Sequence, residues 1–231
     1  MAVEIVYETH STTTDNEAGI ATGRLPGELS ELGCRQAREL GERRSGGGFA
    51  AVFTSDLHRA VRTARIAFPD GRPPIHQDVR LRECDYGALN GSPYPLVAAQ
   101  RTRRLDEPFP GGQSYRQVTA ATSAFLHDLA TGWDNTRILV IAHSANRWAL
   151  DHLLAGTPLE ELLQAPPAWR PGWYYTLPSD WPPPPVNPER QRAAGVSLPE
   201  GARPGERPVR DDGVRGSRAD RHPWREGDAR L

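Results

Sequence analysis

The sequence predicts an α/β fold with a mostly parallel sheet. Short apolar runs bounded by polar residues alternate along the chain with longer segments whose apolar residues recur at helical spacing. Such runs are typical of strands that are buried on both faces of a sheet. Two of them, V-E-I-V-Y-E-T and R-I-L-V-I-A, end directly before a histidine. We therefore expect both imidazoles at the carboxyl ends of strands, where open α/β sheets bind ligands.

The elements follow one another from the N-terminus to about residue 178. The first strand covers 3–9 and ends at His10. Ser30 is the expected N-cap of a helix that runs to about Arg44, with an apolar stripe that includes Leu40. The sequence then predicts a strand, two helices, a strand, a helix and a last strand, over residues 50–54, 57–68, 113–130, 137–142, 146–154 and 173–177.

The composition changes after Pro178. A proline run is followed by a segment rich in Pro, Gly, Arg and Asp that contains few large apolar residues. Such a segment cannot bury enough surface to offset its ordering entropy. We therefore expect a domain over 1–178 and a disordered tail over 179–231, with the proline run in the polyproline II conformation. A solvated tail is favoured over one that binds an aromatic-lined groove of a partner.

The composition also excludes several classes of protein. With 231 residues, of which 37% are hydrophobic, the chain can bury one sizeable core. The formal net charge of -1 argues against a nucleic-acid binder. All 28 basic residues are arginine, which excludes catalysis by a Schiff-base or P-loop lysine. Cys34 and Cys84 form no disulfide or zinc pattern. Without a basic segment before the first apolar run, or a stretch long enough to span a bilayer, we expect a cytoplasmic protein.

Four side chains at the expected strand ends and loops carry the chemistry. His10 and His143 each follow a strand, Arg59 lies in the first turns of the helix after the strand 50–54, and Glu83 lies in a Gly-rich loop. This set suits phosphoryl transfer. One imidazole attacks phosphorus, cations hold the equatorial oxygens, and a carboxylic acid protonates the leaving oxygen.

Six segments in one order resemble a known family, the histidine phosphatase or phosphoglycerate mutase-like superfamily. The family has Arg-His-Gly after its first strand and an Asn six residues past the His, and this chain has T-H-S at 9–11 and then Asn16. The other five segments are L-S-E-L-G-C-R-Q-A at 29–37, T-S-D-L-H-R-A-V-R-T-A at 54–64, L-R-E-C-D-Y-G at 81–87, P-G-G-Q-S at 110–114 and A-H-S at 142–144. Together they span about three quarters of the chain.

The resemblance implies a fold and a role for each matched residue. The fold is a three-layer α/β/α sandwich. His10 is the nucleophile that forms a phosphohistidine, Arg59 and His143 hold the phosphoryl oxygens, and Glu83 is the acid and then the base. Asn16, Ser11 and Ser144 are expected to line the substrate pocket, the two serines narrowing it. No metal and no cofactor are implied, since cationic side chains take the electrostatic role that Mg²⁺ has in kinases. The substrate is a small phosphorylated metabolite, and the short segment after Glu83 leaves the pocket open.

Several of these residues have simpler interpretations. Asp85 could replace Glu83 as the acid, and Asn16 could cap a turn. The arginines at 101, 103 and 104 could bind further anionic groups or form a solvated helix face, which is favoured. The remaining histidines are expected on the surface or in packing contacts: His58, His76, His127, His152 and His222.

Thr9 is the main departure from the family pattern, because it stands where the family has Arg. A guanidinium grips phosphate with paired hydrogen bonds that Thr cannot replace. Arg24 and Arg147 are candidates for the missing cation. A phosphomonoesterase is favoured, with mutase activity as a variant. Two alternatives stay open: an enzyme repurposed for a non-phosphate substrate in specialised metabolism, and a non-catalytic phospholigand-binding protein. The sequence leaves the substrate and the oligomeric state open.

Overall fold

The computed structural model describes residues 1–182, and a five-stranded sheet lies at its centre. The strand order is β4-β3-β6-β1-β7. The bounds of these strands are β1 Ala2–Thr9, β3 Ala51–Thr54, β4 Ile75–Gln77, β6 Arg137–Ala142 and β7 Trp173–Pro178. The first four run parallel, whereas β7 pairs antiparallel with β1 at the sheet's edge. The sheet is therefore mostly parallel, as expected.

The register between β1 and β6 brings the two strand-end histidines together. Thr9 is paired with Ala142 at the end of the ladder, and the His10 amide donates to the Ala142 carbonyl over 2.9 Å. His10 and His143 therefore leave the sheet side by side. This juxtaposition is a consequence of parallel pairing between two strands that are more than 120 residues apart in the chain.

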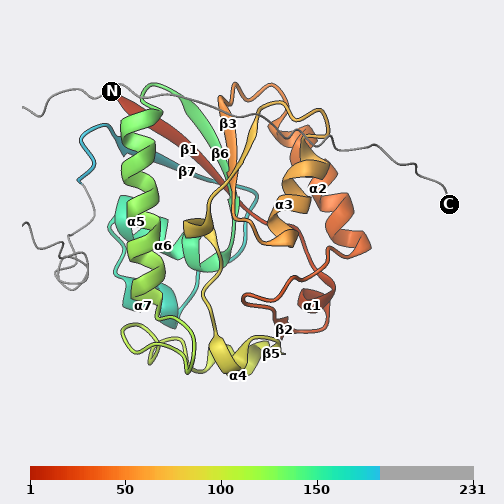
Figure 1. Ribbon diagram of the computed structural model, residues 1–231, viewed down its shortest axis with the longest axis vertical. Coiled ribbons are helices and arrows are strands. Elements are labelled where there is room, and N and C mark those ends of the chain that lie inside the picture. Colours follow the sequence, from red (N-terminus) through yellow and green to blue (C-terminus); the bar gives the residue numbers. More distant parts are fainter. Residues whose placement is uncertain (183–231) are drawn as a thin grey trace, which may run out of the picture. The chain divides into compact units, whose positions relative to one another are not determined.

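Helices cover both faces of the sheet and give the three layers (Figure 1). The helices α2 (Glu31–Arg44) and α3 (His58–Ala67) pack together on one side. On the other side lie α5 (Tyr115–Gly132) and α6 (Ser144–Ala155), with α7 (Leu159–Gln164) beside α6. Ser30 caps α2 as expected by accepting from the Gly33 amide, 3.1 Å away.

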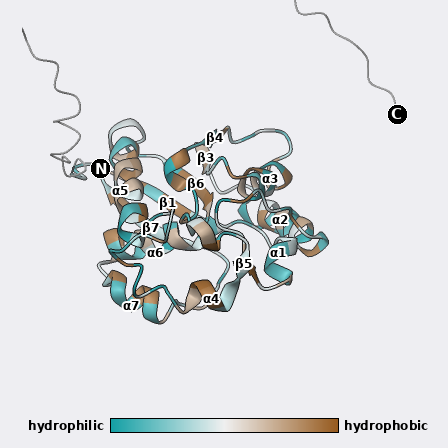
Figure 2. Ribbon diagram, turned by 60° about the horizontal axis from the view of Figure 1, so that its bottom comes forward, coloured by the Kyte–Doolittle hydropathy of each residue, from teal (hydrophilic) through white to brown (hydrophobic). Residues whose placement is uncertain are grey.

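Side chains that alternate along β1 enter two separate cores. Ile5 and Tyr7 join the cluster under α5 and α6, whereas Val6 joins the cluster under α2 and α3. Burial on both faces explains why the sequence of β1 is a nearly continuous apolar run. In Figure 2, hydrophobic colour lies on the central strands, while the helices carry hydrophilic residues on their outward sides.

Small elements gather at the carboxyl end of the parallel strands (Figure 1). They are α1 (Thr14–Glu17), β2 (Ile20–Ala21), β5 (Ser92–Pro93) and α4 (Tyr94–Ala98), and β2 pairs with β5. Two 3₁₀ turns, η1 (Val79–Leu81) and η2 (Gly87–Leu89), lead into and out of the Glu83 loop. Periodicity predicts none of these elements, because each has five residues or fewer.

Two contacts continue beyond Pro178 in the described part of the chain. The Ser179 amide donates to the Met1 carbonyl, and Trp181 packs against the core under α5. The rest of the expected tail, 183–231, falls outside the described residues. Within residues 1–182, no helix is both long and apolar enough to cross a membrane.

Candidate active site

His10 and His143 face each other at the end of β1 and β6. Their ring centroids are 5.0 Å apart, and the ring planes are tilted by 57°. His143 is fully buried and His10 is partly exposed. The pair is therefore accessible to a ligand mainly through His10.

The backbone fixes the tautomer of His10. Its Nδ1 lies 2.8 Å from the Ser11 carbonyl oxygen, which can only accept, so Nδ1 carries the hydrogen and Nε2 carries the lone pair. Burial and then the charge of Arg59 lower the pKa of His10 to about 3. At neutral pH the ring is uncharged, as a nucleophile must be.

Arg59 connects the two imidazoles. Its Nε donates to His10 Nε2 over 3.2 Å, and its Nη2 lies 3.3 Å from His143 Nδ1. The guanidinium is also anchored to the carbonyls of Gly23 and Leu25, 2.8 and 3.0 Å away, and the residue is 2% exposed. These contacts use the planar, multidentate fork of the guanidinium, which a lysine does not have.

His143 is held through both nitrogens and its backbone. Because Arg59 can only donate, Nδ1 of His143 accepts, and Nε2–H donates to Ser55 Oγ over 2.7 Å. The Tyr7 hydroxyl donates to the His143 carbonyl at 2.5 Å. Burial lowers the pKa of His143 well below its usual value, with Arg59 and His10 adding to the effect. His143 is therefore a neutral ring at pH 7.

Glu83 is the buried carboxyl of the site, with 8% of its surface exposed. One oxygen accepts from the Cys84 amide over 2.8 Å. Burial raises the pKa of Glu83 despite this hydrogen bond and the charge of Arg59. A raised pKa is what a proton donor near neutral pH requires. The alternative carboxylate, Asp85, instead holds its own loop by accepting from the Gly87 amide and the Asn90 side chain.

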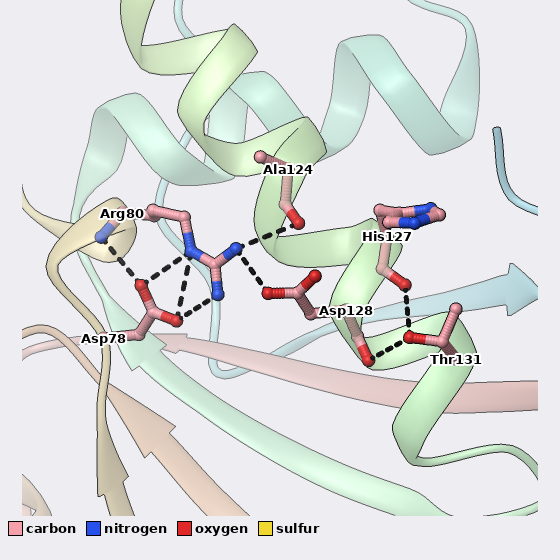
Figure 3. Close-up of polar contacts among 6 residues, drawn as sticks. All are labelled: Asp78, Arg80, Ala124, His127, Asp128 and Thr131. Atoms are coloured by element: carbon pink, nitrogen blue, oxygen red, sulfur yellow. Dashed lines mark hydrogen bonds and ion pairs between the residues drawn. The ribbon is translucent and has the colours of Figure 1, made fainter. Parts of the chain in front are cut away.

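Contacts on both sides of Glu83 hold its loop in place. Before it, Arg80 binds Asp78 and Asp128, both over 2.6 Å, and also the Ala124 carbonyl (Figure 3). These bonds fix η1 to α5, three residues from Glu83. After it, Gly87 has a φ of +54°, and a Cβ there would lie 2.1 Å from the Pro110 carbonyl oxygen. This close approach requires glycine and joins the loop to the P-G-G-Q-S segment.

The remaining predicted residues surround a cavity of 330 Å³ beside His10. Ser11, Asn16 and Ser144 line it together with His10. Asn16 also closes a capping box with Thr13, its side-chain oxygen accepting from the Thr13 amide over 3.0 Å. It therefore both caps a turn and faces the cavity, and its amide N–H group stays free to contact a ligand.

Arg24 and Arg147, the two candidates to replace the missing arginine at position 9, lie in different surroundings. Arg24 points toward the Glu83 loop, where Nη2 donates to Gln113 over 2.7 Å, and its charge acts on both Glu83 and His143. Arg147 is wrong as a candidate. It binds Asp151 over 3.1 Å and stacks on the Trp173 ring, which commits its guanidinium to the fold.

The arginines near residue 100 are also largely committed to packing, so the solvated helix face is wrong for two of them. Arg101 lies between the rings of Tyr94 and Trp148, at 4.9 and 5.2 Å from their centroids. Arg104 is 5% exposed and binds Gln100 and Glu107. Residues 101–106 form turns rather than a helix. Only Arg103 lies on the surface, paired with Glu107.

The other histidines lie outside the site. His58 pairs with Glu28, and His76 stacks on Phe53. The His127 and His152 rings face backbone carbonyls, and His222 is not among the described residues.

Two residues of the site carried no predicted role. Ser55 accepts a hydrogen bond from His143, and its position directly after a strand could have indicated that it belongs to the site. Trp169 lines the cavity and donates its indole N–H to Thr9 Oγ1 over 3.1 Å, which no sequence pattern indicates. Among residues 1–182, no group of three or more His, Cys, Asp or Glu side chains is arranged to hold a metal ion.

Comparison with known proteins agrees with this geometry. The sequence profile of the histidine phosphatase superfamily (branch 1) matches residues 9–168, from the residue before His10 to beyond α7. The chain belongs to this superfamily. The match covers every residue of the histidine, arginine and glutamate set.

The most similar relatives include both mutases and phosphatases. A 2,3-bisphosphoglycerate-dependent phosphoglycerate mutase of Methylocella silvestris is 31% identical over 161 residues, which cover 63% of this chain and 78% of the relative. A Bacillus subtilis protein described as an uncharacterized phosphatase, PhoE, is 31% identical over 142 residues, which cover 61% of this chain and 72% of the relative. The superfamily therefore contains both hydrolases and phosphoryl transferases among the relatives of this chain.

Solved structures share the fold. YhfR of Bacillus stearothermophilus superposes with a TM-score of 0.65 at 27% identity, covering 72% of this chain and 86% of that one. A mycobacterial glucosyl-3-phosphoglycerate phosphatase in complex with VO3 gives a TM-score of 0.62 at 26% identity, covering 69% and 85%. The α/β architecture with a mostly parallel sheet is thus that of histidine phosphatases.

Proposed function

We propose that this protein is a phosphatase that hydrolyses small phosphomonoesters through a phosphohistidine on His10, without a metal ion. The observation that carries the proposal is the position of Arg59. It is shared between two neutral imidazoles, with the free lone pair of His10 Nε2 directed at it. A phosphoryl group at this place meets a nucleophile and a cation at once.

In the first step, His10 Nε2 attacks phosphorus and forms an N–P bond. The bond between phosphorus and the leaving oxygen breaks, and the Glu83 carboxylic acid gives that oxygen its proton. Arg59 stabilises the charge on the equatorial oxygens, and His143 borders the same space. The low pKa of His10 keeps its nitrogen unprotonated over the whole neutral range.

In the second step, water replaces the nitrogen. Glu83, now a carboxylate, takes a proton from the water as its oxygen attacks phosphorus. The N–P bond breaks, and its electron pair returns to His10 Nε2. The burial that raises the pKa of Glu83 favours the return of this proton, so the acid is restored for the next turnover.

The test is phosphate release from a panel of phosphomonoesters in the presence of a chelator. Wild type should turn over, His10→Ala should lose at least a thousandfold, and His127→Ala should match wild type. His127 is a suitable control because its ring takes no part in the site. Quenching of a reaction with ³²P-labelled ester in alkaline detergent should trap alkali-stable, acid-labile phosphate on wild type only. Undiminished turnover in His10→Ala would refute the proposal, and product phosphorylated on a second alcohol would indicate a mutase.

A further inference from the structure

The cavity beside His10 lies on one particular side of the nucleophile. Its lining includes Thr9, His10, Ser144 and Trp169 but not Glu83, Arg59 or His143, so His10 is the member of the proposed catalytic set that borders it. In an in-line displacement the leaving oxygen departs opposite the attacking nitrogen, toward the acid. A space that adjoins the nucleophile and lacks the acid is therefore placed for a substituent that stays on phosphorus.

One guanidinium, that of Arg59, contacts the attacking nitrogen, and a single negative charge on the substrate is enough to balance it. Both imidazoles are neutral at pH 7, so Arg59 is the full positive charge among His10, Arg59, His143 and Glu83. The charge of Arg24 also acts on His143, but its guanidinium donates to Gln113 and lies near the carboxyls of the Glu83 loop. A phosphomonoester carries a charge of about −1.5 to −2 at pH 7, whereas a diester carries one negative charge.

Among residues 1–182, the cavity has no lining cation that is free to bind a third phosphoryl oxygen. Its guanidinium, on Arg43, is bound to Glu8 over 3.3 Å. Glu8 is 1% exposed and also binds Arg44. Its other carboxylate, Glu39, repels anions. The remaining polar side chains, such as Gln36 and Asn16, are uncharged.

Trp169 provides a flat apolar wall for an uncharged group. The residue is 65% exposed, yet its indole N–H is fixed on Thr9 Oγ1, at the end of β1 next to His10. The hydrogen bond holds the ring at the edge of the cavity. With a volume of 330 Å³, the cavity has the size of a small-ligand site.

We infer that the active site also cleaves phosphodiesters, with the organic group that stays on phosphorus seated in the cavity lined by Thr9 and Trp169. The inference rests on the proposed function, since the same nucleophile and acid act. His10 Nε2 displaces one alcohol, which Glu83 protonates, and leaves a phosphohistidine that still bears the second ester group. Water, deprotonated by Glu83, then breaks the N–P bond. The products are one alcohol and one phosphomonoester.

The test uses three substrates with one leaving group, p-nitrophenolate: p-nitrophenyl phosphate, its methyl diester and its phenyl diester. The group that stays on phosphorus is then the only variable. Wild type should cleave both diesters and favour the phenyl one by about tenfold in kcat/KM, because the cavity buries the phenyl ring. His10→Ala should lose all three activities. Trp169→Ala should remove the preference for phenyl over methyl, a ratio that a loss of folded protein does not change.

A charge placed in the cavity provides the reciprocal test. Thr9→Arg should raise the ratio of monoester to phenyl-diester cleavage by about 10- to 100-fold, since a guanidinium fills the cavity and binds a third oxygen. Thr176→Arg is the matched control. Thr176 is exposed on β7 opposite Glu4, far along β1 from Thr9, and its substitution should leave the ratio unchanged.

The outcomes separate the two proposals. Cleavage of p-nitrophenyl phosphate with no cleavage of either diester overturns the diester inference and leaves the phosphatase intact. Diester cleavage that survives in His10→Ala, or an unaltered phenyl preference in Trp169→Ala, also overturns it. If none of the three substrates is cleaved, the proposed phosphatase fails together with the inference.

Discussion

The Nε–H group of Arg59 points at Nε2 of His10 over 3.2 Å, so a cation covers the attacking nitrogen before any substrate is bound. In the proposed reaction, a phosphoryl group enters between the two side chains and takes over this hydrogen bond. The same guanidinium also reaches His143 and two backbone carbonyls. The planar guanidinium thus holds the loop at 23–25, and in the proposed reaction it also binds the phosphoryl group.

Replacing Arg59 by lysine should therefore reduce phosphomonoester turnover strongly while keeping the charge. A lysine ammonium cannot contact both imidazoles and both carbonyls, and the loss of two charge-assisted hydrogen bonds predicts a decrease of about 100-fold or more in kcat/KM. Arg62→Lys on the exposed side of α3 is the matched control and should have no effect. Equal activity of Arg59→Lys and wild type would mean that positive charge alone is needed.

The raised pKa of Glu83 predicts a pH profile that depends on the leaving group. The protonated carboxyl is the donor, so cleavage of alkyl phosphates should decrease as the pH rises through the pKa that burial has raised. p-Nitrophenolate needs no proton to leave, and its ester should show little of this decrease. Measured as release of the alcohol in the first turnover, Glu83→Gln should lower the rate for an alkyl ester by about 100-fold and that for the p-nitrophenyl ester far less. Equal losses for the two esters would contradict the role of acid.

Burial of His10 as a neutral ring predicts lower stability in acid. Its pKa is lowered from 6.5 to about 3, so the unfolded chain binds more protons between these two values. The contribution of His10 is fully present above pH 6.5 and is lost as the pH falls toward 3, by up to about 2 kcal/mol at pH 5. Urea unfolding at pH 7 and pH 5 measures it. His10→Gln should lose less stability than wild type over this interval, and parallel losses would contradict the expectation.

Whether an element could be predicted from the sequence depended on its length and on its burial. The strands β1 and β6 are buried on both faces, and their apolar runs identified them together with the histidines that they end in. Glu83 and Arg59 were proposed as site residues from motifs whose loops are held by distant contacts, such as that of Arg80 with Asp128. The short elements around them were missed, because tertiary contacts rather than local periodicity hold them.

The arginines show what sequence alone does not decide. Arg147 and Asp151 are four residues apart on α6, so their ion pair was within reach of helical spacing. In contrast, the stacking of Arg101 between two aromatic rings depends on α4 and α6 meeting in space. Trp169 reaches Thr9 across 160 residues of chain from an irregular segment. No local signal precedes such a contact.

The segment after Trp181 is predicted to be dispensable for folding and chemistry. Every residue of the site lies before Trp173, and the last core contact described is that of Trp181. Truncation after Pro182 should leave the melting temperature and kcat/KM close to those of the full chain. Truncation after Pro178, which also removes Trp181, should lower the melting temperature, since the loss of a partly buried indole costs stability. A large drop in the melting temperature of the variant truncated after Pro182 would show that part of 183–231 packs on the domain.

The Thr9→Arg variant tests whether the site binds a phosphoryl group. Thr9 now binds the Trp169 indole, so an arginine there must displace the ring and enter the cavity beside His10. If the occupant of the site is a phosphoryl group, the new guanidinium adds a charge-assisted hydrogen bond to it. Inhibition by phosphate should then become stronger. Inhibition by vanadate should improve more, because its five-coordinate form resembles the transition state. Loss of the native activity with no gain in vanadate inhibition would show instead that the space at position 9 belongs to a group other than phosphate, and it would favour a repurposed enzyme.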